Sequence, residues 1–265
     1  MRLTPELLLK ARLRLLRMHY ESKVGHIGGN LSCLDILMTV YHEALGSLDQ
    51  FVLSKGHSAG ALYVTLWSLG LLSDADLTSF HKDGTRLSGH PPPRSIPEIP
   101  FGTGSLGHGL GLAAGLALGK KLKGEGGRLF CLTSDGEWNE GSNWEALTFI
   151  RHHRLNITLI VDLNGLQGFG NTCDIADLRP LAAKFRAFRL ETLEVVGHDV
   201  PSLAEALGHA SQGPLAVVAT TKKGHGVSFM EDLFEWHYLP LSSESYRQAV
   251  RQVTSLCATH SAVLS

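Results

Sequence analysis

The chain has few of the features that mark secreted, membrane-bound or zinc-binding proteins. Its 265 residues include only four cysteines (Cys33, Cys131, Cys173 and Cys257), with no C-x-x-C pair. Scattered cysteines predict reduced core thiols of a cytosolic protein rather than a disulfide framework or a zinc site. No apolar run reaches the roughly 18 residues that a membrane span needs. The first residues also lack the apolar core of a signal peptide. We therefore expect a cytoplasmic protein with no membrane partner.

An excess of charge of either sign is also missing. Lys and Arg number 24 against 25 for Asp and Glu, a formal net charge of −1, and there is no long basic block. Nucleic acid is therefore not an expected partner. Glycine and histidine, by contrast, are plentiful, with 29 and 14 residues. Several histidines adjoin glycine, and a histidine tuned near neutrality suits proton transfer and phosphate contact.

Strands alternate with helices along the chain. Short apolar runs predict strands at 51–54, 128–133, 157–162, 191–196 and 215–220. Helical spacing and capping residues predict helices at 4–20, 32–45, 59–69, 110–122, 178–188 and 202–211, and loops at 25–30, 82–103 and 165–177. This alternation predicts a three-layer α/β fold, with a mainly parallel sheet covered by helices on both faces. We expect a single domain over 1–253 and a C-terminal tail over 254–265.

Two of these strands are followed by oxygen-bearing side chains. Asp135-Gly136 follows the run at 128–133, and Asn164 follows the run at 157–162. The carboxyl ends of parallel strands share one edge of the sheet, so these side chains are expected to meet there, with a helix packed between the strands. Carboxylate and amide oxygens suit Mg²⁺ or Ca²⁺, and Mg²⁺ usually keeps positions open for phosphate. Gly136 would let the backbone approach a diphosphate closely.

Taken alone, an Asp-Gly pair and a later Asn indicate little more than two turns. An ordered set of six blocks is far more specific. The chain carries G-H-I-G-G at 25–29, L-S-K-G-H at 53–57, G-H-P at 89–91, T-G-S-L-G at 103–107, D-G-x₃-E-G at 135–141 and D-x-N at 162–164. Together these blocks resemble the transketolase family. The similarity runs from Met1 to about His237, and it is greatest to the N-terminal, diphosphate-binding subunit of a transketolase that is split into two chains.

The resemblance implies that the cofactor is thiamine diphosphate, held with Mg²⁺ or Ca²⁺ in the family's thiamine diphosphate-binding fold. The positions that match metal ligands are Asp135, Asn164 and the backbone carbonyl of Leu166. Those that match cofactor contacts are His57, Gly104, Leu106, Gly136, Glu137, Asn164 and His237. Those that match catalytic positions are His26, His90, His237 and Glu145. In the family the histidines contact the sugar and its reacting oxygens, and the acid at the Glu145 position joins a proton path between two active sites. By itself, Glu145 is equally well explained as part of a solvated helix face.

Four positions depart from the family pattern: Ile27 for proline, Ser134 for glycine, His108 for glutamine, and Tyr238 where glycine usually follows Trp-His. The first two changes should still permit cofactor binding. The last two are expected near the substrate mouth, and they leave the identity of the sugar open. Lys222 and Lys223 stand in a K-G-K-G-like segment, where a solvated loop is expected for Lys222.

In this family a second α/β domain binds the aminopyrimidine, and such a domain needs roughly another 150 residues. We therefore expect a partner subunit that carries this domain, an α2β2 assembly, and transketolase-type transferase activity only in the assembly. The reaction would move a two-carbon ketol unit from a ketose, or its phosphate, to an aldose or related acceptor. Three alternatives stay open. The first is another thiamine diphosphate enzyme, such as a 2-oxoacid dehydrogenase E1-like or deoxyxylulose-phosphate-synthase-like protein. The second is two-carbon transfer to an unusual sugar or a carrier protein, and the third is a non-catalytic regulatory homologue.

Overall fold

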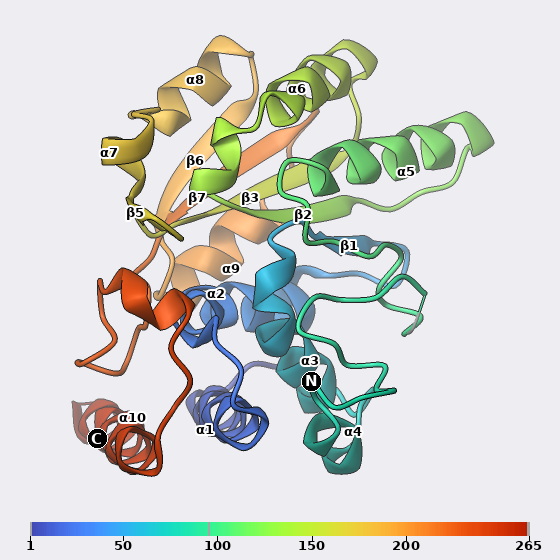
Figure 1. Cartoon of the computed structure of the whole chain (residues 1–265). Coiled ribbons are helices and arrows are strands. Elements are labelled where there is room, and N and C mark those ends of the chain that lie inside the picture. Colours follow the sequence, from blue (N-terminus) through green and yellow to red (C-terminus); the bar gives the residue numbers. More distant parts are fainter. Residues whose placement is uncertain (1, 95, 264–265) are drawn as a thin grey trace.

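A five-stranded parallel sheet forms the centre of the molecule. The computed structural model describes residues 2–94 and 96–263, with side-chain environments through residue 255. The strands lie in the order β1-β2-β3-β7-β6 (Figure 1). Their bounds are Gln50–Leu53 (β1), Leu129–Ser134 (β2), Ile157–Leu163 (β3), Glu191–Val196 (β6) and Leu215–Thr220 (β7). The five expected strands are all present, displaced by at most one residue at either end.

Helices cover both faces of this sheet (Figure 1). One face packs against α2 (Ile27–Thr39), α3 (Ala59–Ser68) and α9 (Val200–Gly208), and α1 (Pro5–Ser22) packs on the outer side of α2 and α3. The other face packs against α5 (Gly109–Lys123), α6 (Gly141–His153) and α8 (Leu181–Ala187). Alternate side chains along β1, β2, β3 and β7 enter two separate apolar cores, as the pleat of a strand requires. The predicted three-layer α/β fold is therefore confirmed.

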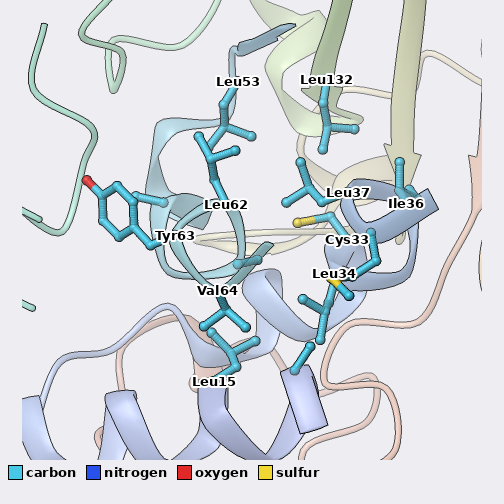
Figure 2. Close-up of a cluster of buried hydrophobic side chains, with 14 of the residues drawn as sticks. Leu15, Cys33, Leu34, Ile36, Leu37, Leu53, Leu62, Tyr63, Val64 and Leu132 are labelled. Atoms are coloured by element: carbon cyan, nitrogen blue, oxygen red, sulfur yellow. The ribbon is translucent and has the colours of Figure 1, made fainter. Parts of the chain in front are cut away.

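The larger core contains α2 and so anchors the end of the segment before it. Leu34 of α2, Leu15 of α1 and Leu62 of α3 belong to one cluster of buried side chains, which extends upward to Leu53 and Leu132 of the sheet (Figure 2). Every residue of α2 is buried, which is typical of a central helix rather than an amphipathic surface helix. Burying a side chain such as Leu34 contributes about 1.5–3 kcal/mol. The N-terminus of α2 is therefore a fixed platform for the turn at 25–26.

Two of the expected loops are partly regular structure. Residues 27–30, expected within a tight loop, form the first turn of α2, where the Asn30 N–H donates to the His26 carbonyl at 3.1 Å. At its other end α2 continues as a π-helix, Val40–Ala44. The loop expected at 165–177 contains an antiparallel hairpin, β4 (Leu166–Gln167) and β5 (Gly170–Asn171), and a short helix, α7 (Thr172–Ile175). Neither the hairpin nor α7 has enough regular length to give a periodic signal in the sequence.

The C-terminal segment forms a helix, α10 (Ser243–Val263), which packs along α1 and includes residues 254–263 of the expected tail (Figure 1). Ala249 and Val253 are buried in the larger core, so one apolar face of α10 is anchored and the helix continues beyond it. Cys33 and Cys131 are buried as expected, whereas Cys173 is half-buried on α7. The side chain of Cys257 lies outside the described residues. No helix in the described part of the chain has the length and apolar character to cross a membrane.

Candidate functional site

The ends of β2 and β3 meet as expected. The two strands pair in parallel, with Ser134 opposite Asp162, and α6 connects them. Asp135 follows β2 and Asn164 follows β3. The Gly165 N–H donates to Asp135 Oδ2 at 2.7 Å, so the two strand ends are in direct contact. The oxygen-bearing side chains therefore share the carboxyl edge of the sheet, where open α/β folds bind ligands.

Asp135 and Asn164 fit a hard divalent cation. Asp135 is 3% exposed, and burial, together with the charge of Asp162, raises its pKa to about 6. The Asn164 amide donates to Asp162 Oδ2 at 3.2 Å, while its Oδ1 accepts from the Leu166 N–H at 3.1 Å. Two buried carboxylates this near each other are stabilised by added positive charge. The donor set, a carboxylate, an amide and the following Leu166 carbonyl, is of the all-oxygen type that Mg²⁺ and Ca²⁺ prefer.

A buried ion pair stabilises the carboxyl end of β3. Lys55, which follows β1, pairs with Asp162 at the end of β3, and neither side chain is exposed to solvent. Asp162 also accepts from Ser32 Oγ of α2 at 2.6 Å and from the Thr221 hydroxyl. Burial alone would raise the pKa of Asp162, but the Lys55 ammonium and these donors hold it below its usual range. The network thereby fixes Asn164, which donates to the same carboxylate.

Beside the strand ends, Gly136 and Gln167 form a cradle that contains an unpaired hydrogen-bond donor. Gly136 opens a 3-10 helix, Gly136–Asn139, and a Cβ added there would lie 2.7 Å from Gln167 Cγ. The Nε2 atom of Gln167 is buried and has no hydrogen-bond partner. An unsatisfied buried donor costs about 1–3 kcal/mol, and an anionic oxygen in the cradle would satisfy it. The cradle therefore fits a diphosphate, and Gln167 is a contact that the sequence did not single out.

Four histidines from segments far apart in the sequence lie together next to this edge of the sheet. The His26 ring centroid lies 4.9 Å from that of His237, 5.6 Å from His90 and 5.8 Å from His57. His26 precedes α2, His57 lies in a 3-10 helix, Gly56–Ser58, His90 lies in the long loop before α5, and His237 ends a 3-10 helix, Phe234–His237. The structure thus brings together the three histidines with expected catalytic roles and His57, which like His237 has an expected cofactor role.

Asn30 holds two of these histidines in place. Its fully buried amide donates to the carbonyl oxygens of His26 at 2.8 Å and His57 at 3.1 Å, and its Oδ1 accepts from the Ala61 N–H at 2.7 Å. The His26 N–H also donates to the His237 carbonyl at 2.9 Å. Asn30 therefore positions both loops, and no spacing rule in the sequence indicates this role.

The imidazoles of the cluster are neutral at pH 7. Burial lowers the pKa of His26 to about 4 and that of His237 to about 3, with the other histidines and Lys223 adding to both shifts. Burial and the Lys55 charge lower the pKa of His57 well below its usual value. Burial also lowers the pKa of His90. A neutral imidazole offers one N–H donor and one acceptor nitrogen, so the cluster can bind several ligand hydroxyl and carbonyl oxygens.

The remaining expected cofactor contacts lie around this cluster. A Cβ on Gly104, whose φ is +152°, would stand 3.0 Å from the His90 ring, and Leu106 is half-buried in the same loop. Glu137 faces inward: its carboxylate accepts from the Gly107 N–H at 3.0 Å, from the Ser134 N–H at 3.2 Å and from the Ser54 hydroxyl. Glu137 therefore fixes the loop that carries Gly104 and Leu106.

Three other expected positions lie at the surface. Glu145 is on the exposed face of α6, which belongs to the helix layer opposite α2. His108 precedes α5 and lines an open hollow of about 690 Å³ with Pro91 and Leu112. Tyr238 is 55% exposed, and its hydroxyl donates to the Gly168 carbonyl in the β4–β5 turn at 2.8 Å. Tyr238 thus adjoins the histidine cluster, whereas His108 borders the hollow beside α5.

A second group of polar side chains, Asp35, His198 and His225, has the residue types of a metal site. His198 donates from Nδ1 to Asp35 at 2.7 Å and accepts the Lys222 N–H at Nε2 at 2.9 Å. Its ring stacks on that of His225 with centroids 3.6 Å apart. Both His198 nitrogens are therefore engaged, and Arg12 neutralises Asp35. This group joins α1, α2 and two loops through hydrogen bonds.

Oxygen donors beside a glycine turn, at the carboxyl edge of a parallel sheet, define the class of the molecule: an α/β protein whose candidate site lies where open α/β sheets bind ligands. The family follows from comparison. Residues 9–255 match the family described as transketolase, thiamine diphosphate binding domain, and the chain belongs to that family. The resemblance found in the six sequence blocks is therefore confirmed.

Relatives of two lengths match the chain. An apulose-4-phosphate transketolase subunit from Phocaeicola vulgatus is 35% identical over 258 residues, covering 92% of each chain. The corresponding subunit from Actinobacillus succinogenes is 38% identical, covering 81% of this chain and 82% of the relative. Human transketolase is 37% identical over 82% of this chain, which spans only 35% of the human protein. Among solved structures, Campylobacter jejuni transketolase superposes with a TM-score of 0.85 at 26% identity, covering 95% of this chain and 43% of that protein.

Proposed function

We propose that this chain is the diphosphate-binding subunit of a thiamine diphosphate-dependent transketolase, transferring a two-carbon ketol unit from a ketose phosphate to an aldose acceptor. The observation that carries the proposal is the contact between the β2 and β3 ends, which puts Asp135, Asn164 and the Gly136 cradle at one edge, below four converging histidines. Thiamine diphosphate, when bound, supplies the electron sink for carbon–carbon cleavage.

The chain's own residues would anchor that cofactor. Asp135, Asn164 and the Leu166 carbonyl would bind Mg²⁺ or Ca²⁺, because they are hard oxygen donors and because Asp135 is a buried carboxylate with a raised pKa. Gly136 and the free Gln167 amide would contact the diphosphate, and His57 would donate a hydrogen bond to it. Glu137 would act indirectly, since its carboxylate holds the loop at 104–107.

His26, His90 and His237 would contact the sugar. As neutral imidazoles they can donate an N–H to a carbonyl oxygen that gains negative charge, and they can accept a proton from a hydroxyl that loses one. The close ring spacing lets two of them bind neighbouring oxygens of one small molecule. Glu145, exposed on α6, would act only across a subunit interface.

A partner subunit would complete the enzyme. The two relatives that are named as transketolase subunits match this chain over most of their length, whereas human transketolase is more than twice as long as this chain. Large apolar side chains also lie exposed beside the histidine cluster: Phe169 is 86% exposed, Tyr238 55% and Leu239 47%. Exposed apolar groups at a site mouth are typical of a surface that another chain covers. We infer an α2β2 assembly in which the partner supplies the pyrimidine-binding domain.

The test combines binding with reconstitution. Calorimetry should show that thiamine diphosphate binds this chain only with Mg²⁺ or Ca²⁺ present, and that Asp135→Asn abolishes binding. A tagged chain should recover a partner with a pyrimidine-binding domain from its native extract. The pair should then transfer a two-carbon unit, with apulose 4-phosphate, named in two relatives, as the first donor to assay. Full activity of this chain alone would refute the split enzyme, and cofactor binding without activity in any pair would favour a regulatory homologue.

A further inference from the structure

Lys223 is a buried cation without a carboxylate partner. The residue is 2% exposed, and none of the ion pairs among the described residues includes it. Its Nζ lies 3.4 Å from the Gln167 carbonyl oxygen and 3.4 Å from Nδ1 of His237. Burial and the nearby Lys55 charge lower the pKa of Lys223 to about 8, so the ammonium form still predominates at pH 7.

The neighbouring lysine shows that this burial is specific. Lys222 pairs with Glu231 at 3.2 Å, and its side chain is 46% exposed, as expected for a solvated loop. The Lys223 stem instead passes over Gly28, where an added Cβ would stand 3.2 Å from Lys223 Cγ. Gly28, in the G-H-I-G-G block, therefore makes room for the lysine. A buried cation without a paired carboxylate costs stability, so its contact with His237 calls for a functional explanation.

The contact determines which nitrogen of His237 carries the proton. An ammonium group has three donors and no acceptor, so Nδ1 must present its lone pair to Lys223. The proton of the neutral ring then sits on Nε2. No hydrogen bond among the described residues uses that Nε2 atom, and a Cβ added at Gly168 would lie 3.6 Å from it. The Nε2–H group is thus left for an oxygen of a bound molecule.

We propose that Lys223 is a positioning residue that fixes His237 as the Nε2–H tautomer, so that His237 donates a hydrogen bond to an oxygen of the sugar substrate. The identity of the ligand rests on the proposed function, whereas the tautomer rests on the Lys223 contact alone. Without the cation the two tautomers compete, and part of the population presents a lone pair to an oxygen that needs a donor. Lys223 thus acts through His237.

The first test reads the tautomer directly in the full chain. With ¹⁵N-labelled histidine, long-range proton–nitrogen spectra distinguish the two neutral tautomers, and His237→Gln identifies the relevant signals. We expect the Nε2–H pattern in the parent chain and in the matched control Lys222→Met, and a mixed pattern in Lys223→Met. Lys223→Arg, which retains a positively charged group with donors and no acceptor, should keep the Nε2–H pattern. A mixed or Nδ1–H pattern in the parent chain overturns the proposal without any variant, even if Lys223→Met does not fold.

The second test measures activity in the assembled enzyme. Misdirecting one oriented donor should lower kcat/KM of Lys223→Met about tenfold, which is less than the roughly 10²–10³-fold loss on removing a transition-state donor outright, because part of the population keeps the Nε2–H tautomer. Lys222→Met should match the parent enzyme. An unchanged kcat/KM in a Lys223→Met enzyme with mixed tautomers would overturn the hydrogen bond to the sugar. If no pair transfers a ketol unit while the spectra behave as expected, the proposed function fails and the tautomer assignment stands.

Discussion

Replacing Lys55 with Met should destabilise the chain through the charge that it leaves behind. Lys55 and Asp162 form a pair in which neither side chain is exposed. Removing one partner of a buried pair costs about 3–5 kcal/mol, because the other charge stays buried without compensation. Asp162 would keep its hydrogen bonds from Ser32 at 2.6 Å, from Asn164 at 3.2 Å and from Thr221. We therefore expect a loss in the free energy of unfolding near the lower end, about 3 kcal/mol at pH 7.

The loss in the free energy of unfolding caused by Lys55→Met should become smaller as pH falls. In the parent chain the pKa of Asp162 is lowered, so its stabilising contribution is present above the unfolded pKa and is lost as pH falls through the folded pKa. Without Lys55, burial dominates and raises the pKa of Asp162 above its unfolded value of about 3.9. The penalty in the variant therefore grows as pH rises through that raised pKa. The difference between the two proteins should shrink as pH falls from 7 toward 4.

Urea unfolding at several pH values measures both effects. Lys222→Met is the matched control: its ion pair with Glu231 is 46% exposed on the lysine side, and such pairs contribute about 0–1 kcal/mol. The double variant Lys55→Met/Asp162→Asn removes the orphaned charge and should recover part of the loss. A cost below about 1 kcal/mol for Lys55→Met, or a cost independent of pH, would contradict the reasoning.

Asp135→Asn should stabilise the metal-free chain by about 1–3 kcal/mol at pH 7 in urea unfolding. In the parent chain the pKa of Asp135 is raised to about 6, so the stability that its protonated form contributes below about pH 4 is lost as pH rises through 6. An Asp135→Asn variant with no gain in the free energy of unfolding at pH 7 would contradict this expectation. Gly136→Ala brings a Cβ to 2.7 Å from Gln167 Cγ, and calorimetry should show about tenfold weaker cofactor binding; parent-like affinity would show that the cradle is roomy. Glu145→Gln should leave cofactor binding to the isolated chain unchanged and lower activity only in the assembly, and weaker binding would contradict its surface position. Ser73→Ala removes the cap of helix α4 (Asp74–Thr78) and should cost about 1 kcal/mol in urea unfolding without affecting the cofactor.

The sequence by itself determined the strands, the three-layer arrangement and the shared sheet edge at which Asp135 and Asn164 lie. Each strand is a short apolar run, and alternation with helices fixes a parallel sheet, so the expected strands agree with the structure within one residue. The meeting of Asp135 and Asn164 followed from a geometric rule, since parallel strands end at one edge. The ordered blocks around His26, His57 and His90 identified the family before any contact was known.

Only the tertiary structure decided how those blocks act on one another. Asn30 joins the His26 and His57 loops, Gln167 leaves a free donor over Gly136, and Lys223 reaches His237. The spacing of apolar residues that predicts a helix or a strand is a local pattern, so it reports on one segment at a time. These contacts join positions that lie up to 31 residues apart, in different helices, strands and loops, and they depend on how α2, β3 and the loops after β7 pack together. A residue's partner across such a distance leaves no period in the sequence, which is why a lysine in a glycine-rich loop could be placed beside a histidine only in the folded chain.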